Sequence, residues 1–455
     1  MEQGIQYAGE FSIKQLTIHT SAGRVFDFKS DKVIGIELYE DLFSTSMSGN
    51  LVLLDIDNIS ENGPIIGQEF LTLKISTPSL EDNDLSFTFN IHKVGTKTEA
   101  NKNVQLLVLN FITPELLRNN RTRVSKSYTD TISNIVKDVL KDTRYINTKK
   151  KLFIEPTSGI RKVVSPNYHP YRFITNLTSE SINSKGSQNY MFFENSRGIH
   201  FKTLDSISET DTIFNYSMGD VGMINGKTVD IGKDFERPLA MTIVSNNDML
   251  LNTMSGMLGS KIIKYNMYNK TYETTRYGYF ADFELNKTID SNPVYNDNFI
   301  DEFQNTIGSF SDAKMYLQPV TSDGKHDIQH TNEINSYSYT PIGISNNLLQ
   351  RRAKITEINS GINVSLKVNG NTIIAVGETI NISFPVVGRP HDSGEFDKYY
   401  SGKYIITTLK HQFDIANRRH TIEMSAAKDS ILTKLPNDAE SLEPFNGSGE
   451  VVEVG

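Results

Sequence analysis

The clearest alternation of hydrophobic and polar residues runs through residues 360–430. A period of two along the chain is typical of half-buried β-strands. Asn369 and Gly370, which follow the first of these strands, predict a hairpin turn because both residues tolerate positive φ. A loop over 385–402, rich in Gly, Pro and Asp, precedes the third strand. The predicted strands are 361–368, 377–384, 403–411 and a last one that places His420, Ile422, Met424 and Ala426 on one side.

A similar order of predicted strands occurs near the start of the chain. Two weakly similar β units in one chain suggest an internal duplication. The alternative is that any two three-stranded meanders look alike, and the pattern alone leaves both interpretations open. The segments that match the last three strands of the C-terminal unit in order are 67–75, 86–93 and 104–110.

From Pro114 the hydrophobic positions follow helical spacing. A helix is predicted to start at Thr129-Asp130 and to turn an apolar stripe toward a core. A second helix is predicted at Pro170, because proline suits a first helical position. A hairpin over 190–202 completes a small mixed α/β unit. The apolar stripe consists of Ile132, Ile135, Val136, Val139 and Leu140.

The pattern after residue 210 is less regular. Methionine and leucine at helical spacing predict one helix that ends at Gly259, and a long tyrosine-bearing segment predicts a single strand. The predicted elements are strands over 221–231, 239–244 and 260–275 and helices over 249–258, 299–307 and 344–352, with irregular structure over 312–340.

Together these patterns predict an α+β protein that is mainly β, with two antiparallel β-barrel domains and inserted α/β domains. A chain of 455 residues is long enough for about three domains with ordinary cores. The acidic C-terminal segment is expected to be flexible unless a partner orders it. The predicted domains are 1–112 (first β-barrel), 113–210 (inserted α/β domain), 211–245 with 341–430 (second β-barrel), 246–340 (second insertion) and 431–455 (acidic tail).

Composition excludes several classes of function. With 37% hydrophobic and 22% charged residues, the chain is typical of a soluble globular protein. Its formal charge of −8 argues against a protein that grips nucleic acid. The absence of cysteine excludes disulfides and thiolate metal sites. No apolar run is long enough to span a bilayer, and the N-terminus predicts no signal peptide.

No catalytic, cofactor-binding or metal-binding motif stands in the context that its chemistry needs. His326 and His330 have the spacing of a zinc helix but no glutamate after the first histidine, so they are interpreted as surface residues. His411 and His420 lie on neighbouring predicted strands, where cross-strand packing explains them better than ligation. A calcium loop near Asp55 is disfavoured. Several basic residues are interpreted as a solvated loop rather than a phosphate site: Arg118, Arg121, Arg123, Lys126 and 149–151.

The chain is therefore predicted to act through its surfaces, and several of its segments resemble one family. They are similar to segments of the baseplate hub protein of T-even-like contractile-tailed phages, and their order along the chain makes the match specific. The last of them also resemble the wider hub group, which includes the hub portion of type VI secretion spikes. The segments are 36–43, 48–50, 64–69, 123–128, 190–195 with 198–201, and 401–411 with 428–430.

The resemblance implies a homotrimeric ring in which each chain contributes two domains similar to the tail-tube subunit. Three chains would then present six such domains and adapt a six-fold tail tube to a three-fold spike. The implied partners are the chain itself, the central spike, the tail tube, the baseplate wedges and the tape measure protein, with DNA only in passage. The implied location is the tail baseplate of the virion, assembled in the host cytoplasm, and no enzymatic activity or cofactor is implied.

Two loops, 385–402 and 94–103, are predicted to make axial contacts with tube or spike, and 113–210 is predicted to meet the baseplate wedges. Two other classes of function remain open. A tail-associated cell-wall-degrading enzyme could lie in 260–340, which matches nothing in the hub family, and zymography on peptidoglycan would reveal it. A receptor-binding adhesin would lie at the outer tips of the tail, away from its axis.

Overall fold

The structure is a computed structural model of the chain. It describes residues 6–28, 32–56, 63–78, 84–101, 104–218, 231–245, 247–266, 270–285, 287–296, 308, 310–320, 344–386 and 396–436.

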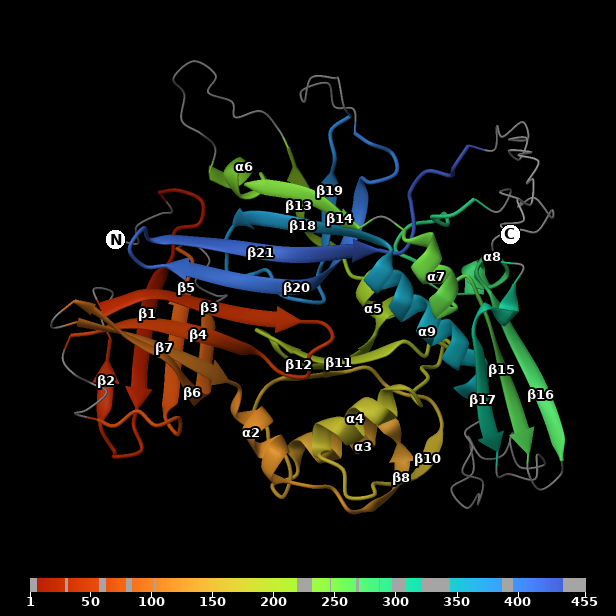
Figure 1. Ribbon diagram of the computed structural model, residues 1–455, viewed down its shortest axis with the longest axis horizontal. Coiled ribbons are helices and arrows are strands. Elements are labelled where there is room, and N and C mark those ends of the chain that lie inside the picture. Colours follow the sequence, from red (N-terminus) through yellow and green to blue (C-terminus); the bar gives the residue numbers. More distant parts are fainter. Residues whose placement is uncertain are drawn as a thin grey trace, which may run out of the picture.

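Two groups of strands build the larger part of the molecule (Figure 1). The N-terminal group is called the first β unit, and the group formed by later strands is called the second β unit. The first β unit contains β1 (Ser12–His19), β2 (Val25–Asp27), β3 (Val33–Asp41), β4 (Ser48–Asp55), β5 (Phe70–Ser76), β6 (Leu85–Asn101) and β7 (Val104–Ile112). The second β unit contains β13 (Thr212–Ser217), β14 (Ala240–Ser245), β18 (Ile362–Asn369), β19 (Thr379–Ser383), β20 (Gly402–Asp414) and β21 (Arg419–Lys428).

All of these strands belong to one 13-stranded sheet. The first β unit has the order β1-β5-β6-β7-β4-β3, with β2 beside β1, and the second has the order β13-β19-β20-β21-β18-β14. When the six strands of each unit, without β2, are numbered along the chain, both units show the same order of strands across the sheet. The units differ in one pairing, because β1 and β5 are antiparallel whereas β13 and β19 are parallel. The predicted class, α+β and mainly β, is confirmed.

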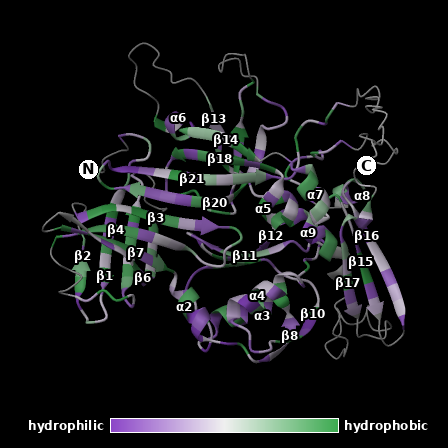
Figure 2. Cartoon of the chain, viewed as in Figure 1, coloured by the Kyte–Doolittle hydropathy of each residue, from purple (hydrophilic) through white to green (hydrophobic). Residues whose placement is uncertain are grey.

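Hydrophobic and hydrophilic residues alternate along the strands of this sheet (Figure 2). The alternation gives each β unit its own hydrophobic core. The strand β3 has one irregularity, because a bulge between Val33 and Gly35 shifts its register. Val33 is therefore buried and Ile34 exposed, while Ile36 and Leu38 face the core.

Residues between the units form a separate α/β layer with its own core. The apolar stripe of the first predicted helix is buried as expected, but the helix begins at Ile132. Residues Ser127–Thr131 form a strand instead, and the Thr131 hydroxyl caps the helix by accepting from Asn134 N. The helix at Pro170 and the hairpin over 190–202 are confirmed. The elements are α2 (Pro114–Arg121), β8 (Ser127–Thr131), α3 (Ile132–Lys141), β9 (Leu152–Ile154), β10 (Ile160–Val164), α4 (Pro170–Thr178), β11 (Tyr190–Asn195), β12 (Gly198–Thr203) and α5 (Leu204–Ser208).

The second insertion differs most from the sequence prediction. Its first helix ends at Ser255 and is capped by Gly256, which has a φ of 83°, rather than ending at Gly259. The predicted long strand over 260–275 is a hairpin, and a further strand lies in the segment predicted to be irregular. The predictions for 221–230, 299–307 and 321–340 fall on residues outside those that the structure describes. The elements of the insertion are α7 (Met249–Ser255), β15 (Gly259–Asn266), β16 (Thr271–Gly278), α8 (Tyr279–Asp282), η3 (Phe283–Leu285), η5 (Ser311–Ala313) and β17 (Met315–Val320). Two helices flank it, α6 (Ile231–Phe235) before it and α9 (Ile344–Ser360) after it.

Two predicted connections are also wrong. Asn369 and Gly370 do not turn a hairpin, because β18 pairs with β14 and β21. Gly370 instead lies against His420, whose ring would be 2.3 Å from a Cβ at that position. The segment 94–103, predicted to be a loop, is largely the end of β6 and the start of its hairpin with β7.

Candidate assembly site at the junction of the two β units

One strand serves both β units. The first part of β20 pairs with β19, from Ile382↔Gly402 to Thr379↔Ile405. A bulge in its pairing with β21 follows between Ile406 and Thr408, and the rest of β20 pairs with β3. This second ladder runs antiparallel from Thr408↔Asp41 to Asp414↔Gly35. The two units are therefore joined by a continuous ladder of backbone hydrogen bonds.

The ladder between β3 and β20 is called the seam, and side chains across it add further contacts. Lys410 Nζ lies 2.8 Å from Glu37 Oε1, and the Tyr39 hydroxyl donates to the same carboxylate. Gly49 lies on β4 beside Glu37 of β3, and a Cβ added at Gly49 would be only 2.3 Å from the Glu37 carbonyl oxygen. Only glycine fits that close approach of β4 to β3. The segments 36–43, 48–50 and 401–411, which resemble the hub family in sequence, thus lie side by side at the seam.

The turn between β11 and β12 enters the junction from the α/β layer. The buried Glu40 carboxylate accepts from Ser196 N at 2.8 Å and from Val376 N at 2.9 Å. Asn195 Nδ2 donates to Val376 O at 2.9 Å. Glu40 therefore connects the first β unit, the α/β layer and the second β unit through one side chain. Burial raises the pKa of the Glu40 carboxyl to about 7.

Two further contacts hold the same turn against the second β unit. The Arg197 guanidinium donates to Ile373 O at 2.8 Å and pairs with Glu378 at 2.8 Å. Gly377, with a φ of 78°, lies over the Phe193 ring, which would be 2.8 Å from a Cβ there. A larger residue at 377 would be strained and would displace the ring.

A buried ionic cluster joins parts of the α/β layer, and its Glu194 carboxylate also accepts from Met47 N of the first β unit at 3.3 Å. Lys150 Nζ pairs with Glu194 and lies 2.9 Å from Glu115. Glu194 is fully buried and also accepts from Thr113 Oγ1 at 2.9 Å. Burial alone would lower the pKa of the Lys150 ammonium, but the two carboxylates raise it above its ordinary value. The interpretation of 149–151 as a solvated loop is therefore wrong for Lys150.

A second buried ionic cluster fastens α9 to the end of β21. Lys354 and Asp429 are both buried, and Lys354 Nζ pairs with the Asp429 carboxylate and donates to Lys287 O at 3.0 Å. Asp429 also accepts from Ile289 N at 3.0 Å. The hub-like segment 428–430 thus anchors both α9 and the loop at 287–290 to the second β unit.

His411 and His420 pack across β20 and β21, as the sequence predicts. Both are fully buried, with His411 Nδ1 3.0 Å from His420 Nε2. The His420 ring stacks on Phe413 with a centroid distance of 4.1 Å, and Phe11 meets Phe413 edge to face at 5.2 Å. Burial lowers the pKa of His411 to about 3, so this aromatic cluster is uncharged at neutral pH.

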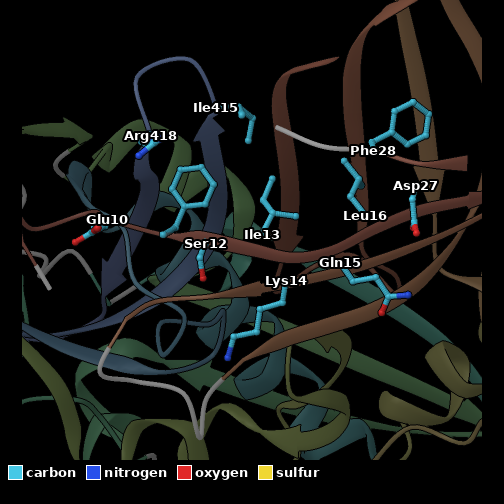
Figure 3. Close-up of a pocket in the computed structure, with 11 residues that line it drawn as sticks. Glu10, Ser12, Ile13, Lys14, Gln15, Leu16, Asp27, Phe28, Ile415 and Arg418 are labelled. Carbon is cyan, nitrogen blue, oxygen red and sulfur yellow. The ribbon is translucent and has the colours of Figure 1, made fainter. Parts of the chain in front are cut away.

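A groove of about 930 Å³ lies beside β1, near the turn that follows β20. Figure 3 shows Ile13 and Leu16 on the side of β1 that faces Phe28 and Ile415, whereas Lys14 points the other way. The two carboxylates that line the groove already have partners, because Glu10 accepts from Gln6 N and Asp27 from Thr17 Oγ1. The groove is a recess of mixed polar and apolar lining at the rim of the first β unit.

Across the part of the chain that the structure describes, no three His, Asp or Glu side chains group closely enough to hold a metal ion. In that same part, no helix is both long and apolar enough to cross a membrane. His326 and His330, considered and rejected above as a zinc pair, lie outside the described residues.

The raised pKa of Glu40 predicts a pH-dependent junction. A carboxyl whose pKa is raised on folding contributes stability that is fully present below its unfolded pKa and is lost as the pH rises toward and through its folded pKa. We expect the free energy of unfolding to fall by about 1 kcal/mol between pH 6.5 and 8.5 on account of Glu40, given a folded pKa of about 7. Urea unfolding of the wild type and of Glu40→Gln is followed by circular dichroism at both pH values. The contribution of Glu40 is the difference between the two proteins in how far the free energy of unfolding falls from pH 6.5 to 8.5. Equal pH dependence in both proteins would contradict it.

No family model matches the sequence, and no curated protein matches it. Solved structures do match. The 43 kDa tail protein of prophage MuSo2 from Shewanella oneidensis superposes with a TM-score of 0.52 at 8% identity, over 91% of this chain and 98% of that one. A tail protein from Neisseria meningitidis superposes with a TM-score of 0.50 at 9% identity, over 92% and 97%. Because both chains are matched over nearly their full length, the chain has the fold of these two tail proteins.

Proposed function

We propose that the chain is the baseplate hub of a contractile phage tail. In this proposal three copies form a ring with pseudo-six-fold symmetry, which adapts the six-fold tail tube to the three-fold central spike and surrounds part of the DNA passage. The observation that carries the proposal is the repeated strand order of the two β units. A ring of three chains that each hold two alike units can offer six similar surfaces to a six-fold partner.

The junction supports this function because it fixes the two units relative to each other. An adaptor must present its units at a constant angle, and the shared strand β20 with the Glu40 contacts leaves little freedom between them. The fold shared with two tail proteins supports the same assignment. The proposed domains are those predicted from the sequence: 1–112, 113–210, 211–245 with 341–430, 246–340 and 431–455.

The proposed partners follow from these parts. The two β units would contact the tail tube on one face of the ring and the spike on the other, with the tape measure protein as a further axial partner. The α/β layer at 113–210 would meet the baseplate wedges. The protein would assemble in the host cytoplasm and remain in the virion, acting as a structural component without enzymatic activity.

Native mass spectrometry of the purified protein tests the proposal. We expect a species of three times the 51.2 kDa of one chain, either alone or after addition of the tail-tube subunit. Electron microscopy of the virion should place this species on the tail axis, between tube and spike. A single chain under every condition, or a position at the outer tips of the tail, would contradict the proposal.

A further inference from the structure

The seam inside one chain shows how one β unit attaches to the next. The outer edge of β3, the last strand of the first β unit, is added to the part of β20 that extends beyond β19. This part of β20 begins at the bulge between Ile406 and Thr408. The attachment therefore needs two features: a strand edge at the end of one unit, and an overhanging strand in its neighbour.

The first β unit has a similar overhang, with one further irregularity between Val94 and Lys97. In the order of the units β6 corresponds to β20, and β5 pairs with β6 only from Ile75↔Leu85 to Phe70↔Asn90. A bulge between Ile91 and Lys93 follows at the place where β20 has its own bulge. Beyond it β6 pairs with β7, and among the described residues no strand pairs with its other edge. The side chains of Lys93, Thr96 and Thr98 are exposed there.

The second β unit has the matching strand edge. In the order of the units β14 corresponds to β3, and it is the end strand of the 13-stranded sheet. It pairs with β18 as β3 pairs with β4. Ala240 and Thr242 are exposed, and the apolar Val244 is 65% exposed. A strand edge of this kind readily accepts another strand.

The overhang of β6 and the edge of β14 cannot meet in one chain, because β18, β21, β20, β3, β4 and β7 lie between them in the sheet. We propose that β14 of one copy adds antiparallel to β6 of the next, around residues 93–98, and repeats between chains the contact that β3 and β20 make within one. This contact is head-to-tail, so successive copies close into a ring when the rotation allows. Closure after three copies rests on the proposed function above.

The repeat also predicts the register of the contact. Positions are counted along the strand that each one pairs with. Thr98 of β6 then occupies the position that Gln412 has in β20, and Thr242 of β14 the position that Glu37 has in β3. Gln412 lies opposite Glu37 in the seam. Thr98 is therefore expected opposite Thr242 of the neighbouring copy, at a distance that a disulfide can bridge.

Disulfide trapping tests this contact without background, because the chain has no cysteine. The variant Thr98→Cys/Thr242→Cys is mildly oxidised and run on a non-reducing gel. The matched control is Thr98→Cys/Thr212→Cys, whose second cysteine lies exposed on β13. We expect about tenfold more interchain disulfide in the first variant, because paired strands hold the two thiols at a high effective concentration. The linked species should stop at three chains.

The outcomes separate the contact from the proposed function. A native trimer of the wild type with no more linkage in the first variant than in the control would overturn the contact and leave the hub proposal standing. A wild type that remains a single chain, alone and with the tube subunit, would overturn the hub proposal. Linked species that continue beyond three chains would support the edge contact and overturn closure at three.

Discussion

Replacement of Asp429 by alanine should lower the free energy of unfolding by about 3–5 kcal/mol, because it leaves the Lys354 ammonium buried without its counter-charge. Ile289 N would lose its acceptor in the same step. In the wild type, burial raises the pKa of the neighbouring Glu357 to about 8, so Asp429 is the main counter-charge of Lys354 at neutral pH. The loss would be measured as the shift of the urea midpoint, followed by circular dichroism.

Glu423→Ala is the matched control for this prediction. Glu423 also pairs with a lysine, Lys367, at 2.7 Å, but both side chains are more than two-fifths exposed. Such a pair contributes about 0–1 kcal/mol, so the midpoint should hardly move. Similar losses in the two variants would show that burial of the Lys354–Asp429 pair does not set its effect.

Replacement of Phe413 by alanine should cost about 3–5 kcal/mol, the usual loss for a buried phenylalanine. Phe413 belongs to β20 of the second β unit, yet its fully buried side chain lies in the core of the first. It stands opposite Ile36 in the seam and stacks on His420. We therefore expect both β units to be destabilised together, which hydrogen exchange resolved by segment would show as faster exchange in β3 and β4 as well as in β20.

Phe70→Ala provides the comparison, because Phe70 lies on β5 of the first β unit, whose core holds the Phe413 side chain, but is itself 48% exposed. Its loss should be about 1 kcal/mol or less, since substitutions on partly exposed surfaces have small effects. Faster exchange confined to β20 in Phe413→Ala would contradict the idea that the two cores depend on this side chain.

The strands that alternate cleanly could be predicted from the sequence because alternation is a local property. The side chains of β4 and β21 follow it almost without exception. Local signals failed where a distant part of the chain decided the geometry. Gly370 looked like a turn residue, but the close approach of His420 requires the glycine there. Likewise the turn before β16 includes Lys270 at a φ of 53°, a residue type that carries no turn signal.

The junction was only partly visible in the sequence. Glu40 falls in phase with Ile36 and Leu38 on the buried face of β3, so a carboxylate on a core face was a signal that could have been used. Its partners, Ser196 and Val376, lie far away along the chain and could not be inferred from spacing. Lys354 had no such signal, because the helix was predicted to stop at residue 352 and in fact continues to Ser360.

The pairing of β3 with β20 has a consequence for biosynthesis. On the ribosome, β3 emerges near the beginning of translation and β20 close to its end. The edge of β3 therefore cannot pair with β20 until nearly the whole polypeptide has been synthesised. Pairings between such distant segments form slowly, because a long loop has to close first. During that interval the nascent chain exposes the unpaired edge of β3, and exposed strand edges promote aggregation. A polypeptide truncated before residue 402 should therefore accumulate in inclusion bodies or bind chaperones.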